Sequence, residues 1–236
     1  MSSKNPSLVN GEIYHVVSRS VGDATVFDDE KDFYRGIFCI YEFNNSKPVN
    51  MWIRRRNRII EKKVLGRTSL TSQERDKFVE VLAFSFMPNH LHLILRQIKE
   101  GGISKFMQKV GTGFANYFND RYERQGHVFN KFRAIHIKND NQLKNAFVYV
   151  HCNLISLIEP GWKEGGVENP DKVIKFLENN KRHSYPDYLG NKNFSSVTER
   201  NFFLEAMGGA SGCKTYVDSW IRYKKELKDW TNIILE

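Results

Sequence analysis

Two histidines one residue apart, His90 and His92, stand in the apolar segment FMPNHLHLIL (86–95). Side chains at positions i and i+2 of a β-strand leave the same face, so both imidazoles would point the same way, with Cα atoms roughly 6.6 Å apart. The intervening leucines would point to the opposite face. Two imidazoles at that separation are able to ligate one divalent metal ion. The alternative is that each histidine is an ordinary core or edge residue, and the motif alone leaves both interpretations open.

A second candidate group lies on the segment NQLKNAFVYVHCNLISLI (141–158), which has helical periodicity. Tyr149 and Asn153 are four residues apart and therefore lie together, beside the apolar stripe. An asparagine inside a helix is unfavourable by propensity and needs a reason. Its side-chain oxygen is a hard ligand that can join two histidines on a divalent ion. Tyr149 taken alone is equally explained as an amphipathic residue at the edge of the core. The apolar stripe consists of Leu143, Phe147, Val150 and Leu154.

The remaining sequence predicts the elements that must position these side chains. Their order is βαββαβ followed by a helix, which predicts an α+β fold of the ferredoxin-like type, an antiparallel sheet with helices on one face. Asp28 is the expected cap of the first helix, and Gly126 the expected end of the second. Beyond Pro160, three further helical patterns predict a C-terminal helical extension (160–236) to a catalytic domain (10–159). The expected strands are 12–20, 79–87, 90–96 and 132–139, and the expected helices are 28–45, 103–126 and 141–158.

The chain is strongly basic, with a formal net charge of +9 and a pI of about 9.4. The segment 51–67, which we call the basic segment, holds seven basic residues against a single acidic one. It lies within a stretch at about 47–77 that we interpret as a basic insertion in the catalytic domain. Such a balance favours a polyanionic partner, most often nucleic acid. A solvated charged face is the alternative for the basic segment. The residues expected to contact phosphates are Arg54, Arg55, Arg56 and Arg58.

Targeting and cysteine patterns are uninformative about chemistry but limit the class of protein. No apolar run approaches the length needed to span a membrane, and the first residues lack a signal-peptide pattern. We therefore expect a cytoplasmic protein without a membrane partner. The three cysteines are widely spaced and form no CxxC pair, so neither a disulfide framework nor a structural zinc cluster is predicted.

With these motifs in order, the sequence resembles the IS200-type tyrosine transposases of the HUH class, and most closely their REP-associated branch. The resemblance covers about residues 10 to 190 and rests on MPNHLHLIL, the segment 103–133 and AFVYVHCNLISLIEPG. YHVVSRS near the start and SYPDYLG (184–190) are also similar to family segments. It implies that Tyr149 is a nucleophile and that His90, His92 and Asn153 bind a divalent metal, Mg²⁺ or Mn²⁺.

The resemblance also implies cleavage and rejoining of single-stranded or hairpin DNA through a covalent phosphotyrosine, by a monomer or a homodimer. Arg19 on the first strand and Arg121 on the second helix are further candidates for DNA contact. Two other functions stay open from the residues themselves. One is a metal-dependent phosphodiesterase that uses water, and the other is a non-catalytic nucleic-acid-binding protein or repressor derived from a transposase.

Overall fold

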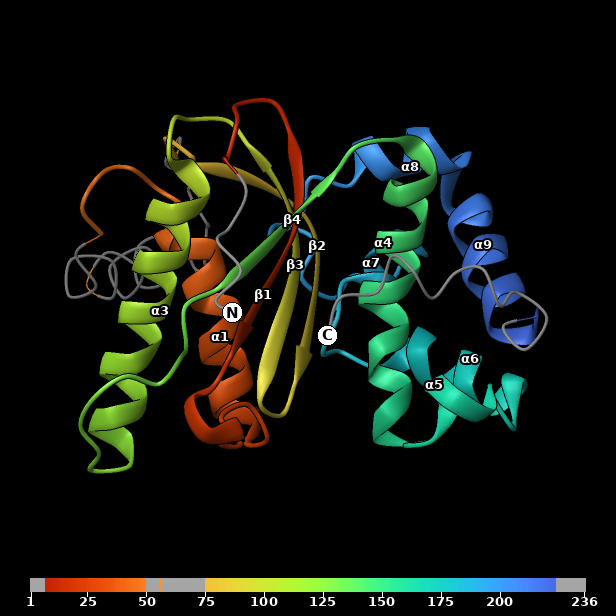
Figure 1. Ribbon diagram of the computed structural model, residues 1–236, viewed down its shortest axis with the longest axis horizontal. Coiled ribbons are helices and arrows are strands. Elements are labelled where there is room, and N and C mark those ends of the chain that lie inside the picture. The colour runs from red at the N-terminus through yellow and green to blue at the C-terminus, as the bar shows by residue number, and fades with distance from the viewer. Residues whose placement is uncertain (1–6, 50–55, 57–74, 224–236) are drawn as a thin grey trace.

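The structure is a computed structural model that describes residues 7–49, 56 and 75–223 (Figure 1). Four antiparallel strands form one sheet in the order β2-β3-β1-β4. β2 and β3 are joined by the two-residue turn at Pro88 and Asn89, and β1 pairs with both β3 and β4. The predicted four-stranded antiparallel sheet is therefore confirmed. The strands are β1 (Ile13–Arg19), β2 (Val79–Met87), β3 (His90–Gln97) and β4 (Arg133–Ile137).

One face of the sheet is covered by α1 (Glu30–Phe43) and α3 (Gly102–Arg121) (Figure 1). The N-cap of α1 is Asp29, whose side chain accepts a hydrogen bond from the Lys31 amide at 2.8 Å, so the expected cap at Asp28 was one residue early. α3 ends at Arg121, five residues before the expected stop. The residue that ends it is Glu123, whose φ of 50° lies in the left-handed region and cannot continue a helix.

The opposite face is also covered by helices, and the expectation of helices on one face only was wrong (Figure 1). β2 and β3 are buried along almost their whole length, so both faces present apolar side chains to the interior. Leu82 and Ile94 point to the second face and pack in one cluster with Phe147 of α4. Burying this second face removes apolar surface from water and places α4 (Asp140–Cys152) against the sheet.

The C-terminal helices complete this second layer and share its hydrophobic cluster with the sheet. Trp162 and Trp220 meet there with ring centroids 5.4 Å apart. All three cysteines are buried and none of them forms a disulfide. In the part of the chain that the structure describes, no helix is both long and apolar enough to cross a membrane. The shorter elements are η1 (Val21–Asp23), η2 (Asn153–Leu157), α5 (Trp162–Gly165), α6 (Pro170–Asn179), α7 (Tyr185–Tyr188), α8 (Asn201–Met207) and α9 (Gly209–Tyr223).

Candidate active site

His90 and His92 open strand β3 directly after the hairpin turn, and both point toward the layer of α4. Each lies within hydrogen-bonding distance of Asn153 at the end of α4. The leucines at positions 91, 93 and 95 belong to the cluster on the α1 and α3 side. The period-two alternation predicted from the sequence is therefore confirmed. Both imidazoles are buried, with 9% of His90 and 3% of His92 exposed.

Asn153 and Tyr149 come from the C-terminal end of α4. The α-helix stops at Cys152 and continues as the 3-10 helix η2, so the single helix predicted over 141–158 is in fact two elements. The backbone amide of Asn153 donates to the carbonyl of Tyr149, which fixes the two residues relative to each other. The Asn153 Nδ2 atom lies 2.8 Å from His92 Nε2 and 3.3 Å from His90 Nε2.

The second nitrogen of each imidazole also has a partner. His90 Nδ1 lies 2.6 Å from Asn89 Oδ1, and His92 Nδ1 lies 2.9 Å from His15 Nε2. An amide oxygen only accepts, so His90 Nδ1 carries the proton that it donates to Asn89. Because the Asn153 amide nitrogen only donates, both Nε2 atoms are acceptors. Both histidines are thus in the tautomer whose Nε2 lone pair is directed at Asn153.

Tyr149 is packed against these rings. Its ring centroid lies 5.5 Å from that of His92 and 5.6 Å from that of His15, and both contacts are edge-to-face. The sequence placed Tyr149 beside the core, whereas only 7% of it is exposed. α4 packs closely on the sheet. A residue beside the apolar stripe of α4 is therefore covered by the face of β1 and β3 that carries the histidines. The four residues His90, His92, Tyr149 and Asn153 therefore meet at one place.

The site is buried and surrounded by positive charge. Burial lowers the pKa of His15 to about 4. Burial also holds the pKa of His92 well below its ordinary value. Electrostatic repulsion of a protonated His92 by His15, His90, Lys163 and Arg19 lowers it further. At neutral pH the rings of His15 and His92 are consequently neutral. A neutral imidazole is the form that ligates a metal.

The residues present fit a divalent metal ion. The neutral imidazoles of His90 and His92 present Nε2 lone pairs. A 180° rotation of the Asn153 side-chain amide presents its oxygen beside them. Each imidazole already donates through Nδ1 to a neighbour, as ligating histidines usually do. Among the described residues, no three His, Cys, Asp or Glu side chains gather as a metal-binding group. A site here would therefore depend on the amide as its third protein ligand.

The arginines predicted to contact DNA do not lie together in the structure. Arg19 ends β1 directly opposite His90 and forms an exposed ion pair with Asp23 at 3.1 Å, so it lies at the margin of the site. Arg121 lies on the other side of the sheet, where it contacts Asp29 at 2.8 Å and also pairs with Asp32. Arg56 is exposed. Arg54, Arg55 and Arg58 lie outside the described residues.

Sequence reasoning gave His15 and Asn89 no role beside the paired histidines. The register of β1 against β3 pairs Val17 with His92 and His15 with Ile94, which places His15 diagonally next to His92 on one face. The sequence does not specify this register. A period-two pattern in β1 predicts the face of the sheet on which His15 lies, but not which residue of β3 lies beside it. Lys163 of the short helix α5 was also missed.

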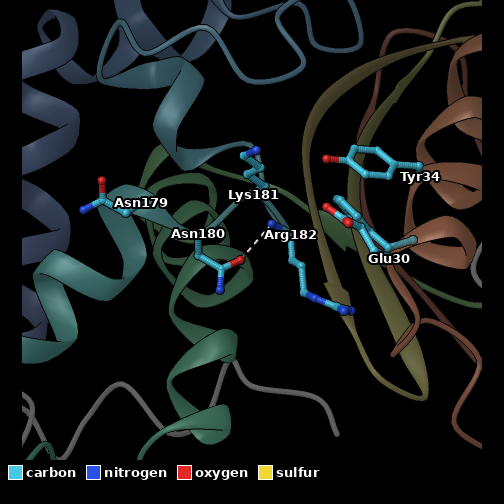
Figure 2. A pocket seen from close by; sticks show the side chains of 7 residues that line it. Glu30, Tyr34, Asn179, Asn180, Lys181 and Arg182 are labelled. Atoms are coloured by element: carbon cyan, nitrogen blue, oxygen red, sulfur yellow. Dashed lines mark hydrogen bonds between the residues drawn. The ribbon is translucent and has the colours of Figure 1, made fainter.

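A groove away from these residues does not belong to the site. A groove of about 390 Å³ lies beside the outer edge of β2, between α1 and the segment that follows α6 (Figure 2). The Arg182 carbonyl accepts from the Phe86 amide there, and the Arg182 amide donates to Asn180 Oδ1 at 2.7 Å. None of the four site residues lines this groove. Its lining is Glu30, Phe33, Tyr34, Asn179, Asn180, Lys181 and Arg182.

Comparison with known proteins places these observations in a family context. A family model described as "Transposase IS200 like" matches residues 45–153, a range that contains all four site residues. No curated protein matches the sequence. The fold is similar to a solved REP-associated tyrosine transposase bound to a REP hairpin, with a TM-score of 0.50 and 12% identity over 84% of this chain and 90% of that one. At this identity the likeness concerns the fold alone.

A second similar structure is a bacterial tRNA(His) guanylyltransferase (Thg1)-like protein in complex with ATP. Its TM-score is 0.36 and its identity 10%, over 78% of this chain and 77% of that one. A likeness at this level carries no functional argument.

Proposed function

Because this chain belongs to the IS200-like transposase family, we propose that it cleaves and rejoins single-stranded DNA through a covalent phosphotyrosine on Tyr149. The observation that carries this proposal is the meeting of Tyr149 and Asn153 with the Nε2 atoms of His90 and His92. These side chains come from one strand and one later helix. A nucleophile and three ligands at one place are the parts that a metal-assisted phosphoryl transfer needs.

The proposed metal site comprises His90, His92 and Asn153. A bound Mg²⁺ or Mn²⁺ would neutralise charge on the scissile phosphate and polarise a non-bridging oxygen. The imidazoles contribute neutral donors held in the required tautomer, so no proton has to leave them when the ion binds. The burial of all three ligands limits competition from water for the same positions.

Tyr149 supplies the nucleophile. Its phenol oxygen attacks phosphorus in line, forming a phosphorus–oxygen bond to the tyrosine as the bond to the 3′-oxygen breaks. The departing 3′-oxygen takes up a proton and becomes a 3′-hydroxyl, and the tyrosine loses its proton to solvent or a base. A free tyrosine has a pKa near ~10, so the site must favour proton loss during attack. Attack by a 3′-hydroxyl on the phosphotyrosine reverses the step and rejoins the strand.

The proposed substrate is single-stranded or hairpin DNA. The net charge of +9 and the position of Arg19 at the margin of the site support a phosphate-rich partner. The similar solved transposase is bound to a REP hairpin, which makes hairpin DNA the first substrate to test. The basic segment, with Arg54, Arg55, Arg56 and Arg58, is proposed as a further phosphate contact. Arg121 would need to leave its two aspartates to take part.

We further infer a ferredoxin-like fold for the catalytic unit (10–159), with the helices of 160–236 as its extension. The order β1, α1, β2, β3, α3, β4 is supporting evidence, because a β-α-β-β-α-β order is typical of that fold. A cytoplasmic location, and a monomer or homodimer, remain part of the proposal.

The test is incubation of the protein with a pool of single-stranded hairpin DNAs and Mn²⁺, followed by denaturing electrophoresis. We expect a covalent protein–DNA species that requires the metal, and His92→Ala should abolish it without lowering the melting temperature substantially. His136→Ala is the matched control, because His136 pairs with Glu12 and stacks on Tyr14. Cleavage without an adduct would favour the water-using phosphodiesterase. Binding without cleavage would favour the non-catalytic alternative.

A further inference from the structure

The hydrogen bond between His15 and His92 has a consequence for how the site is assembled. We propose that His15 is a positioning residue that fixes the tautomer of His92 and the location of the Tyr149 ring. The inference rests on the proposed function, since it assigns His15 a task toward a metal ligand and a nucleophile. His15 itself touches neither substrate nor metal in this assignment.

The geometry brings the three rings into direct contact. His15 and His92 leave the same face of adjacent strands, with their rings nearly parallel at 17° and centroids 5.1 Å apart. His15 Nε2 lies 2.9 Å from His92 Nδ1, which is hydrogen-bonding distance. Only 5% of His15 is exposed, so water does not readily replace this contact.

The direction of the hydrogen bond follows from the partners on either side. A neutral imidazole has one nitrogen that donates and one that accepts. Asn153 Nδ2 donates to His92 Nε2, so His92 Nδ1 must carry the proton and donate it to His15 Nε2. His15 then carries its own proton on Nδ1. As long as His15 accepts at this position, His92 keeps its Nε2 lone pair available for a cation.

His15 also supports the nucleophile. Its ring meets the Tyr149 ring at 77° with centroids 5.6 Å apart, and His92 meets the same ring at 90°. Tyr149 is therefore held against two imidazoles that are themselves hydrogen-bonded to each other. A core histidine without this task would contribute to stability alone. A positioning residue changes metal affinity and the state of His92 even where the fold is unaltered.

Three variants separate these roles. His15→Phe keeps an aromatic ring against Tyr149 and removes the acceptor, whereas His15→Gln keeps an acceptor oxygen and loses the ring. His136→Phe is the control, because His136 is a histidine on the neighbouring strand that pairs with Glu12 instead of a site residue. Circular dichroism and thermal melting establish that each variant is folded before any comparison is made.

The first readout is Mn²⁺ affinity without DNA, followed by electron paramagnetic resonance of the free ion. We expect His15→Phe to bind Mn²⁺ about 10- to 100-fold more weakly than wild type, the range usual for loss of a ligand's hydrogen-bond partner. His15→Gln should retain more affinity, and His136→Phe should match wild type. Saturating Mn²⁺ should restore covalent adduct formation in His15→Phe. Wild-type affinity in His15→Phe, or a loss of adduct that saturation does not restore, would overturn the inference.

The second readout does not depend on metal or DNA. Long-range ¹H–¹⁵N NMR correlations report which nitrogen of His92 is protonated. We expect protonated Nδ1 in wild type. In His15→Phe we expect a mixture of tautomers, because without the acceptor at His15 the Asn153 amide is free to turn and accept from a protonated Nε2. An unchanged tautomer in that variant, or protonated Nε2 in wild type, would refute the role of His15. If wild type binds no Mn²⁺, the proposed function fails by itself, and this measurement still decides whether His15 sets the His92 tautomer.

Discussion

Acid should destabilise this protein through histidines that the fold buries in the neutral form, and His183 provides the clearest test. It is completely buried beside the edge of β2, where it forms a bridge with Ser85, and its Nε2 donates to the Leu177 carbonyl at 2.8 Å. Burial lowers its pKa from 6.5 to about 4. We predict that replacing His183 with glutamine, which retains an amide donor, makes the free energy of unfolding less dependent on pH.

The sign follows from proton uptake in the two states. Below pH 6.5 the unfolded chain binds a proton at this histidine, whereas the folded chain does so only near pH 4, so stability falls as the pH drops through this window. For one group with these two pKa values, the free energy of unfolding is about 2 kcal/mol lower at pH 5 than at pH 7. Buried His15 has the same shift and His151 a lowered pKa as well, so the total loss in wild type exceeds this amount.

The assay is urea unfolding of wild type and His183→Gln at pH 7 and pH 5. The variant should lose about 2 kcal/mol less between the two pH values, whatever its stability at pH 7. The same substitution at the exposed His127 is the matched control for the mutation itself. If His183→Gln loses as much stability as wild type over this interval, the assignment of His183 as a buried neutral group is incorrect.

Two further predictions concern the charged residues. Neutralising the four arginines of the basic segment should weaken DNA binding and reduce the slope of log K against log salt, by ~0.7 for each lost contact to a single strand; an unchanged slope would leave this segment as a solvated face. Arg121→Gln should lower the free energy of unfolding, because it leaves the buried Asp32 carboxylate with fewer partners. It should not alter the salt slope, and wild-type stability with a reduced slope would instead favour a direct DNA contact.

The site shows which part of the arrangement was predictable from sequence. Alternation along β3 was sufficient to place His90 and His92 on one face, and the spacing of Tyr149 and Asn153 was sufficient to pair them on α4. Both are consequences of the local geometry of one element. The place of His15 depends on the register between β1 and β3, which are separated by 70 residues of chain between Arg19 and His90, and no local pattern specifies it.

The helical layer on the second face of the sheet was harder to predict, because it also depends on residues far apart in the chain. The residues of β2 read as a strand, and its bounds were as expected, but burial on its second face depends on helices that follow much later in the chain. The role of Arg121 was equally non-local. In the sequence, Arg121 is one basic residue near the end of a helix. In the structure it belongs to a hydrogen-bond network with Asp32 of α1 and the hydroxyls of Tyr117 and Tyr122.

The central claim is that Tyr149 becomes covalently joined to DNA, and mass-spectrometric mapping of the adduct tests it most directly. Wild-type protein trapped on hairpin DNA with Mn²⁺ should yield a nucleotide-bearing peptide modified at Tyr149. Tyr149→Phe should fold, bind Mn²⁺ and DNA, and form no adduct, whereas Tyr122→Phe should form it normally because that hydroxyl donates to Asp32 on the other side of the sheet. An adduct that persists in Tyr149→Phe, or that maps to Tyr117 or Tyr122, would contradict the account.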